Sequence, residues 1–359
     1  MSDSTKTGAN TTESPLLSVV IPAYNAAAHI CRTLDSVFAQ TFFDFEVILV
    51  NDGSPDTESL EQAMQPYRSR IRYFRQDNRG PSSARNLGIL KARGKFIALL
   101  DSDDLWLPHH LARQLEILQQ NPELGLVYSN AIHLKENRPV GVAFDSVSQS
   151  GEPTLDALLA EQCTVNTSSV VARRDLLLEA GLFDESMNRC EDFDLWLRLA
   201  SEGVRMDYDR EIQVCHRLGE GLTADRTSMK QGRMQAYRKM AGRSGLQLAQ
   251  RSLIEKKLSA LEWEIQTELT KRSLLAGQYE EALSAASKAN SLASSVKLRM
   301  TLFGVRYFPG LLRRIYTVYL QILRSYHTAK NSDSIKEIQI GGKRVNLESL
   351  IRPLLSPQR

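Results

Sequence analysis

Acidic side chains occur at two places where the sequence pattern predicts that a strand ends. Asp52 closes one apolar run, and Asp101 and Asp103 follow another, with Asp104 beside them. The carboxyl ends of strands in an open α/β sheet meet at one edge, where ligands bind. Two carboxylates one residue apart at such an edge can hold a hard divalent cation, Mg²⁺ or Mn²⁺, and leave positions for phosphate oxygens. Such a metal would neutralise the charge that develops on a departing diphosphate.

A third acidic feature, Glu191 and Asp192, opens a helical pattern. A carboxylate there can project into a cleft and take the proton of an attacking hydroxyl as a general base. Structural roles are open alternatives, because Asp52 can cap a turn or helix and Glu191 and Asp192 can favour a helix dipole. Trp106 and Trp196 are expected to pack in the core rather than to stack on a sugar.

The elements that must position these acids alternate between strand and helix over residues 17–130. Short apolar runs predict strands at 18–22, 45–52, 71–74, 96–101 and 125–128. Helical patterns lie between them at 27–40, 57–68, 82–93 and 108–120. This alternation predicts an α/β fold, with a Rossmann-like, mainly parallel sheet and helices on both faces.

The rest of the chain changes character twice. Residues 131–153 lose periodicity and gather Pro, Gly and Ser, which predicts a loop or insert. A helix at 155–161, a strand at 168–171, a helix at 192–201 and β-type segments near Met206 and Ile212 follow, and the pattern is then helical from 224 to about residue 328. We expect a disordered tail at 1–16, an α/β domain at 17–223 and a helical C-terminal region at 224–359.

Six short motifs follow one another in the α/β part of the sequence. They are Val19-Val-Ile-Pro-Ala-Tyr-Asn25, Val50-Asn-Asp-Gly-Ser54, Asn78-Arg-Gly-Pro-Ser-Ser-Ala-Arg-Asn-Leu-Gly88, Leu99-Leu-Asp-Ser-Asp-Asp104, Phe183-Asp-Glu185 and Glu191-Asp-Phe-Asp-Leu-Trp196. Their number, order and spacing resemble the family 2 glycosyltransferases of GT-A fold, the fold of nucleotide-diphospho-sugar transferases. The resemblance covers roughly residues 17–223.

The resemblance implies a donor site at the first motifs. Pro22, Tyr24 and Asp52 would border the base and ribose of a nucleotide-sugar, with Asp52 accepting a hydrogen bond from the base. Arg85 would support either the diphosphate or the edge of the sheet.

The resemblance also implies roles for the later motifs. Asp101 and Asp103 would form the Asp-x-Asp motif, with Asp103 preferred as the direct metal ligand. Asp101 and Ser102 would contact the nucleotide-sugar. Asp192 matches the general base of the family, with Glu191 beside it.

One motif departs from the resemblance. Members often carry Tyr-Arg-x-His before a Ser/Gly-Leu-Ser/Thr stretch, whereas Cys215, His216, Arg217 and Leu218 hold those places here. His216 would contact a metal or a phosphate only if the register slips by two residues. The Gln-x-x-Arg-Trp motif of processive synthases is missing, so that class is not expected.

Composition limits the partners and the compartment. A net charge of +3 gives no overall field that would favour nucleic acid. The four cysteines have no paired spacing, which favours reduced thiols over disulfides or a zinc site. Residues 1–16 lack a signal-peptide pattern, and no window reaches the roughly 18 apolar residues of a membrane span. We therefore expect a cytoplasmic protein.

Charge is uneven near the C-terminus. Between Ala282 and Ser332 there are eight Lys or Arg residues and no Asp or Glu. Seven apolar residues share one helical face there: Leu311, Leu312, Ile315, Val318, Tyr319, Ile322 and Leu323. This basic amphipathic helix is predicted either to pack on the protein or to contact an anionic membrane from the cytoplasmic side.

The expected activity is therefore transfer of a sugar from a UDP-sugar, or less favourably a GDP- or dTDP-sugar, to a glycan or lipid-linked acceptor. Cell-surface polysaccharide or lipopolysaccharide assembly is the expected setting. One alternative is a binding module for nucleotide-sugars without catalysis. Another is a phosphotransferase of the haloacid dehalogenase type, although its Asp-x-Asp normally follows the first strand rather than the fourth.

Overall fold

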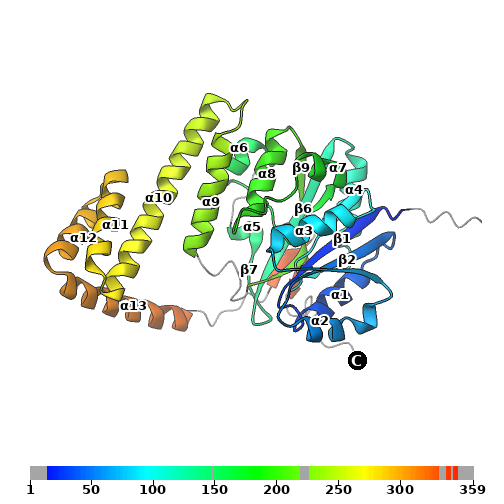
Figure 1. Ribbon diagram of the computed structural model, residues 1–359, viewed down its shortest axis with the longest axis horizontal. Helices are drawn as coiled ribbons and strands as arrows, with labels where there is room; N and C mark the ends of the chain where they lie inside the picture. Colours follow the sequence, from blue (N-terminus) through cyan, green and yellow to red (C-terminus); the bar gives the residue numbers. More distant parts are fainter. Residues whose placement is uncertain are drawn as a thin grey trace, which may run out of the picture.

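The computed structural model describes residues 14–146, 149, 151–218, 226–330, 337–340 and 343–346. In this part of the chain a nine-stranded sheet carries helices on both faces (Figure 1). Its strands are β1 (Leu17–Ala23), β2 (Phe45–Asp52), β3 (Ile71–Gln76), β4 (Phe96–Leu99), β5 (Leu105–Trp106), β6 (Leu124–Lys135), β7 (Arg138–Val142), β8 (Val171–Arg173) and β9 (Arg205–Arg217). The helices among them are α1 (Ile30–Phe38), α2 (Thr57–Ala63), α3 (Pro81–Lys91), α4 (His110–Gln120), α5 (Ala143–Ser146), α6 (Leu155–Leu159), α7 (Arg174–Glu179) and α8 (Glu191–Ser201), with 3₁₀ turns at Gln65–Tyr67 and Thr167–Ser169.

The sheet has a parallel half and a mixed half. Its order is β3-β2-β1-β4-β8-β6-β9-β5, and β7 pairs with β6 outside this path. The strands β3, β2, β1 and β4 are parallel, as the alternation predicted. β8 runs antiparallel to β4 and β6, β9 is parallel to β6, and β5 is antiparallel to β9. The predicted α/β class is confirmed.

The strands of the parallel half are buried on both faces because successive side chains point to opposite sides. Val20 and Ile48 pack in the cluster that contains Ala84 of α3. Their neighbours Val19 and Val47 pack instead in the cluster that contains α1. Each run of four or five apolar residues therefore serves two cores.

Helix α3 lies unusually close to β1. A Cβ atom added to Gly88 would lie 2.4 Å from Cγ1 of Val20, so only glycine fits this crossing. The helix begins at Pro81, whose ring presets the first helical turn, directly after Gly80 with φ of 89°. This close packing holds α3 at a fixed distance from β1. It thereby fixes where the α3 side chains lie relative to the edge of the sheet.

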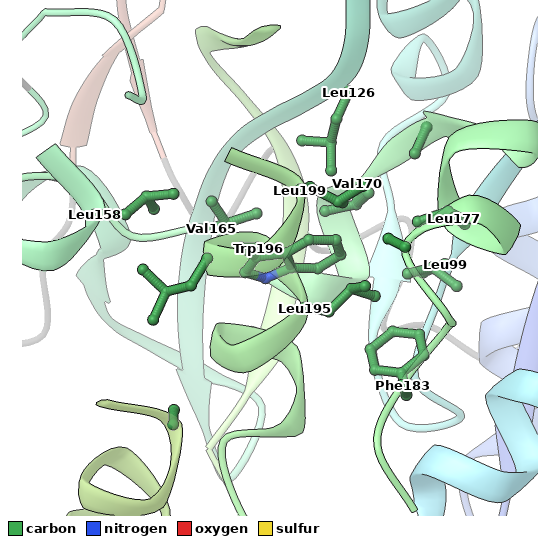
Figure 2. Packing of buried hydrophobic residues seen from close by; sticks show 14 of the residues in the cluster. Leu99, Leu126, Leu158, Val165, Val170, Leu177, Phe183, Leu195, Trp196 and Leu199 are labelled. Carbon is green, nitrogen blue, oxygen red and sulfur yellow. The ribbon is translucent and has the colours of Figure 1, made fainter. Parts of the chain in front are cut away.

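Both tryptophans that could have contacted a sugar are buried, as predicted. Trp106 is 0% and Trp196 1% exposed. Figure 2 shows Trp196 in the middle of its cluster, with Val165, Leu199 and Phe183 around it. These rings therefore belong to the core that supports the site.

The prediction of a loop or insert over residues 131–153 is wrong for residues 131–146, most of which lie in strands or a helix. β6 continues to Lys135, and a two-residue turn at Glu136 and Asn137, with φ of 50° and 63°, leads into β7. Positive φ at both positions suits a tight hairpin, but the turn lacks the glycine that usually marks it. Pro139 lies in β7, where an edge strand tolerates it. The β-type segments near Met206 and Ile212 are likewise one strand, β9.

Five helices follow, as the helical pattern predicted. They are α9 (Arg226–Ala241), α10 (Leu248–Ala276), α11 (Tyr279–Leu292), α12 (Val296–Tyr307) and α13 (Pro309–Lys330). Tyr237 of α9 and Ile254 and Leu261 of α10 belong to the same buried cluster as Trp196. The far end of α10 packs instead with α11 and α12, through Leu274 (Figure 1). The helical region is therefore joined to the α/β domain by a shared core.

The two chain ends differ from the sequence prediction in detail. Residues 1–13 of the predicted tail lie outside the described residues, while Leu16 already donates its N–H to Asp44 at 3.2 Å. After the helices, β10 (Glu337–Ile340) and β11 (Lys343–Asn346) pair in antiparallel fashion, beyond about residue 328, where the predicted helical pattern ends. Among the described helices, none has the length and apolar content that a bilayer crossing requires.

Candidate active site

The Asp-x-Asp segment lies directly after β4, at the carboxyl edge of the parallel strands. The N–H of Asp104 donates to the carbonyl of Asp101 at 3.1 Å, which closes the segment into a turn. The hydroxyl of Thr33 on α1 contacts the carbonyl oxygens of Ser102 and Asp104 at 2.9 and 3.0 Å. The N–H of Asp101 donates to Ser168 Oγ at 3.2 Å. Backbone contacts from two elements therefore hold the turn and leave its carboxylates to other partners.

Arg85 joins two acidic motifs that are far apart in the sequence. Its guanidinium lies 2.7 Å from Asp101 Oδ1 and 2.8 Å from Glu191 Oε1. Burial would lower the pKa of Arg85, but the two carboxylates outweigh it and hold that pKa above its usual value. Both roles proposed for Arg85, at the diphosphate and at the edge of the sheet, stay predictions, and the structure places its guanidinium against two carboxylates. The strand-end acids and the start of α8 thus meet at one guanidinium.

Asp192 is held at the first turn of α8 by a different partner. Thr167 donates its hydroxyl to Asp192 Oδ2 at 3.0 Å, and the N–H of Phe193 donates to Asp192 Oδ1 at 2.7 Å. Cys190 precedes the helix in the left-handed region, with φ of 58°, which turns the chain sharply into α8. Because Glu191 is taken by Arg85, Asp192 is the acid of the pair that suits proton transfer.

The electrostatics of the turn favour a bound cation. Burial, followed by the like charges of Asp104 and Asp101, raises the pKa of Asp103 to about 7. Among the described residues, Asp103 forms no salt bridge, and the nearby charge of His216 lowers its pKa without cancelling the rise. Burial and Asp192 also raise the pKa of Glu191, which Arg85 opposes.

A divalent cation fits this donor set. In the described part of the chain, no group of three or more His, Cys, Asp or Glu side chains is arranged to hold a metal. Mg²⁺ and similar ions commonly bind through one or two carboxylates plus substrate phosphates. Asp103 and Asp101 match that need, and a cation held there would offset the like charges that, together with burial, raise the pKa of Asp103.

His216 reaches the site through a strand pairing. β5 pairs with β9 so that Leu105 lies opposite Cys215, which places His216 beside Asp104. The two side chains form an ion pair, with His216 Nδ1 3.1 Å from Asp104 Oδ2. Asp104 raises the pKa of His216 to about 9. Burial opposes ionisation of Asp104, but His216 and the N–H of Arg217 hold its pKa below the usual value. His216 is thus next to the predicted metal ligands and already bound to an acid.

The predicted base- and ribose-binding residues meet at the ends of β1 and β2. Tyr24 is 51% exposed, and Pro22 pairs with Val50 in the register of β1 and β2. Asp52 is 3% exposed and accepts the N–H of Arg79 and of Gly80, at 2.9 and 2.8 Å. The structure therefore gives Asp52 the capping role that was one of its two alternatives. Contact between its carboxylate and a base stays a prediction.

Three supporting residues were not assigned roles from the sequence. Asn86 exchanges two hydrogen bonds with the backbone of Phe183, at 2.8 and 2.9 Å, and thereby fixes the segment that leads to α8. Thr167 holds Asp192, and Ser168 holds Asp101. A run of polar residues between apolar segments, Asn166-Thr-Ser-Ser169, was the only signal for the last two.

Sequence comparisons identify relatives of this domain. Residues 18–179 match the family described as Glycosyl transferase family 2. An uncharacterised glycosyltransferase of Rickettsia typhi is 32% identical over 227 residues, which cover 60% of this chain and 67% of that protein. One of Rickettsia bellii is 33% identical over 193 residues, 52% of this chain but only 27% of the longer relative. The match to a second long relative, from Rickettsia felis, spans 31% of that protein.

Solved structures have the same fold. TarS of S. aureus, residues 1–349 in complex with UDP-GlcNAc, is similar with a TM-score of 0.57 and 17% identity, over 92% of this chain and 96% of that one. The mannosyltransferase PcManGT of Pyrobaculum calidifontis, in complex with GDP-Man and Mn²⁺, gives a TM-score of 0.56 and 18% identity over 85% of each chain. At these identities the likeness shows the fold alone, which is the GT-A arrangement.

Fold, acidic motifs and sequence matches agree. The chain belongs to the family 2 glycosyltransferases. The resemblance drawn from the six motifs is confirmed, and nothing supports the haloacid dehalogenase alternative.

Proposed function

We propose that the protein transfers a sugar from a nucleotide-sugar to an acceptor hydroxyl with inversion at the anomeric carbon. The observation that carries this proposal is the double ion pair of Arg85, 2.7 Å to Asp101 and 2.8 Å to Glu191. It holds the Asp-x-Asp turn beside the start of α8, where Asp192 stands. A displacement of diphosphate needs stabilisation of a leaving anion and a proton acceptor in one place.

The residues of the chain divide the work as follows. Asp192 takes the proton of the acceptor hydroxyl while that oxygen forms a bond to the anomeric carbon. The bond from this carbon to the diphosphate oxygen breaks, and its electron pair leaves with the diphosphate. Thr167 orients the carboxylate of Asp192 through its 3.0 Å hydrogen bond. A cation held by Asp103 and Asp101 supplies neutralisation of the diphosphate charge when it is bound.

A UDP-sugar is the proposed donor, with Mg²⁺ or Mn²⁺. Support comes from the neighbouring fold of TarS, whose structure contains UDP-GlcNAc, and of PcManGT, whose structure contains Mn²⁺ with a GDP-sugar. The proposed acceptor is a glycan or lipid-linked sugar in cell-surface polysaccharide or lipopolysaccharide assembly. We place the reaction on the cytoplasmic face of a membrane, where four free cysteines are stable and a lipid-linked acceptor is within reach.

Two measurements on the full chain test this function. In thermal-shift titrations with UDP, GDP, dTDP and CMP, with and without Mn²⁺, we expect the largest stabilisation from UDP with metal, since ligands that bind only the native state raise its stability. Asp103→Asn should abolish the metal-dependent part. Release of UDP from UDP-sugars should then show turnover. Nucleotide binding without any turnover would instead establish a binding module.

A further inference from the structure

Helix α12 exposes an apolar stripe to solvent. Val296, Met300, Phe303 and Tyr307 follow the i, i+4, i+7, i+11 spacing of one helix face, and they are 58–69% exposed. The first three line a surface hollow of about 390 Å³ together with Arg299. Isolated exposed apolar residues are ordinary, but a continuous stripe indicates an interaction surface.

Helix α13 carries a second stripe. Leu311, Ile315, Val318 and Tyr319 are 51–59% exposed. They belong to the face that the sequence predicted would pack on the protein or contact a membrane. Packing on the protein is not what the structure has for these four, although Leu312 does pack against the cluster of α10, α11 and α12.

Neither stripe is needed to hold its helix in the fold. The opposite face of α12 is buried through Leu298 and Val305, which are 6% and 3% exposed. Leu312 does the same for α13, with its Cδ2 atom 3.1 Å from where a Cβ of Gly304 would lie. The two helices thus pack through one face and present a second apolar face outward. We call the outward stripes of both helices, with the exposed cations beside them, the α12–α13 surface.

Cations surround these stripes and have no acidic partners. Lys297, Arg299, Arg306 and Arg314 are exposed, and none forms a salt bridge with any described residue. No Asp or Glu occurs between Ala282 and Ser332. By helical spacing, Arg299 and Arg306 flank the α12 stripe on one side, seven residues apart, with Lys297 on the other. Long basic side chains in such places can bury their stems and keep their charges at a polar boundary.

The charge decides which occupant fits. Two copies of the chain meeting through this surface in a twofold dimer would bring the same cations together, which is unfavourable. An anionic lipid surface supplies the missing negative charge. It also offers a boundary where phenyl and phenol rings, such as Phe303, Tyr307 and Tyr319, are stable.

We propose that the α12–α13 surface binds the face of an anionic lipid bilayer, with both helices lying in the plane of the headgroups. The apolar stripes enter the headgroup–acyl boundary, and the flanking cations contact lipid phosphates. The benefit of this docking, access to a lipid-linked acceptor, rests on the proposed function. The docking itself requires no turnover.

Vesicle flotation of the full chain tests the proposal. We expect binding to vesicles that contain phosphatidylglycerol and much weaker binding to phosphatidylcholine alone. Arg299→Gln with Arg306→Gln should weaken binding to anionic vesicles roughly 30-fold, given the usual contribution of each cation near such a surface. Met300→Ser with Phe303→Ser should weaken binding to both kinds of vesicle.

The matched control is Lys256→Gln with Arg272→Gln, two exposed cations of α10 that carry the same charge change outside the α12–α13 surface. This control should bind vesicles within about twofold of the unmodified chain, because charge beyond the surface is screened within a Debye length. Equal loss in the control, or binding that ignores lipid charge, would overturn the proposal. The proposal would also be overturned if light scattering showed a dimer that Met300→Ser with Phe303→Ser dissociates, while the chain did not bind vesicles. UDP-dependent thermal shift, measured without lipid, separates this failure from failure of the proposed function.

Discussion

The α/β domain and the helices α12 and α13 differ in the burial and the ion pairing of their cationic side chains. In the domain, Arg85 is 8% and Arg198 12% exposed at the side chain; Arg85 is paired with Asp101 and Glu191, and Arg198 with the buried Asp194. On α12 and α13, Arg299 and Arg306 are exposed and unpaired among the described residues. A buried pair fixes the geometry of the groups around it, whereas an exposed cation without a partner leaves its charge available to a second molecule. The contrast separates cations that fix the geometry of the groups around them from cations that can attract a second molecule.

The largest effect that follows from this contrast is on turnover. Asp192→Asn should lower kcat for sugar transfer by about 100- to 10,000-fold, because the amide cannot accept the acceptor proton. Folding should persist, since an amide oxygen still accepts the hydrogen bond of Thr167. Steady-state kinetics with the donor identified by thermal shift would measure it.

A matched control exists on α7. Asp175 stands in the first turn of that helix and accepts the N–H of Leu176 at 3.0 Å, just as Asp192 accepts that of Phe193. Asp175→Asn should leave kcat unchanged. An equal loss in both variants would mean that first-turn charge, not proton transfer, is what matters.

The next largest effect is expected on stability, when the paired guanidinium of Arg85 is removed. Arg85→Met should reduce the free energy of unfolding by about 3–5 kcal/mol, because Glu191 and Asp101 then lie near one another without a counter-charge. Adding Glu191→Gln should restore part of this loss, and urea unfolding of the single and double variants measures the coupling. No recovery in the double variant would show that Arg85 acts by packing rather than by charge.

A smaller effect concerns a buried polar group without a partner. His110 is 0% exposed, stacks on Trp106 with ring centroids 4.6 Å apart, and has no hydrogen bond to its ring nitrogens from the described residues. Burial lowers the pKa of His110 to about 3. Below about pH 6.5 the unfolded chain binds a proton that the folded protein excludes, so stability falls as the pH falls, by about 1.4 kcal/mol per pH unit.

His110→Phe keeps the stacked ring and removes the titration. The difference in unfolding free energy between this variant and the unmodified chain should therefore grow between pH 6.5 and pH 5. A constant difference across that range would mean that His110 is hydrated or paired in solution.

The smallest effect is expected on α12. Arg299→Gln with Arg306→Gln should change the free energy of unfolding by less than about 0.5 kcal/mol, since exposed residues without partners contribute little to stability. Thermal or urea unfolding in the absence of lipid measures it. A loss comparable to that of Arg85→Met would erase the contrast between the two regions.

Sequence reasoning succeeded where the signal was local. Asp101, Asp103 and Asp192 lie at the ends of a strand and a helix that periodicity alone predicts, and parallel strands bring their carboxyl ends to one edge. Trp196 was expected to pack in the core, and it is 1% exposed. The α/β fold class followed from the alternation of predicted strands and helices over residues 17–130.

It failed where the signal was distant or absent. The two-residue strand β5 is too short to show a period, so its pairing with β9, which brings His216 to Asp104, was not predictable. The contact of Arg85 with Glu191 spans 106 residues and depends on the close approach of α3 to β1. The β6–β7 hairpin was missed because its turn, Glu136 and Asn137, lacks the glycine that usually marks such a turn.

One element links the two regions mechanically. The 29 residues of α10 make a rod about 43 Å long, at 1.5 Å per residue. Its first half contributes Ile254 and Leu261 to the buried cluster that contains Trp196, and its far end packs with α11 and α12 (Figure 1). Because the helix has no break, α10 is a stiff rod and not a flexible linker. If the α12–α13 surface rests on lipid, a rigid α10 keeps that lipid at a fixed distance from the α/β domain.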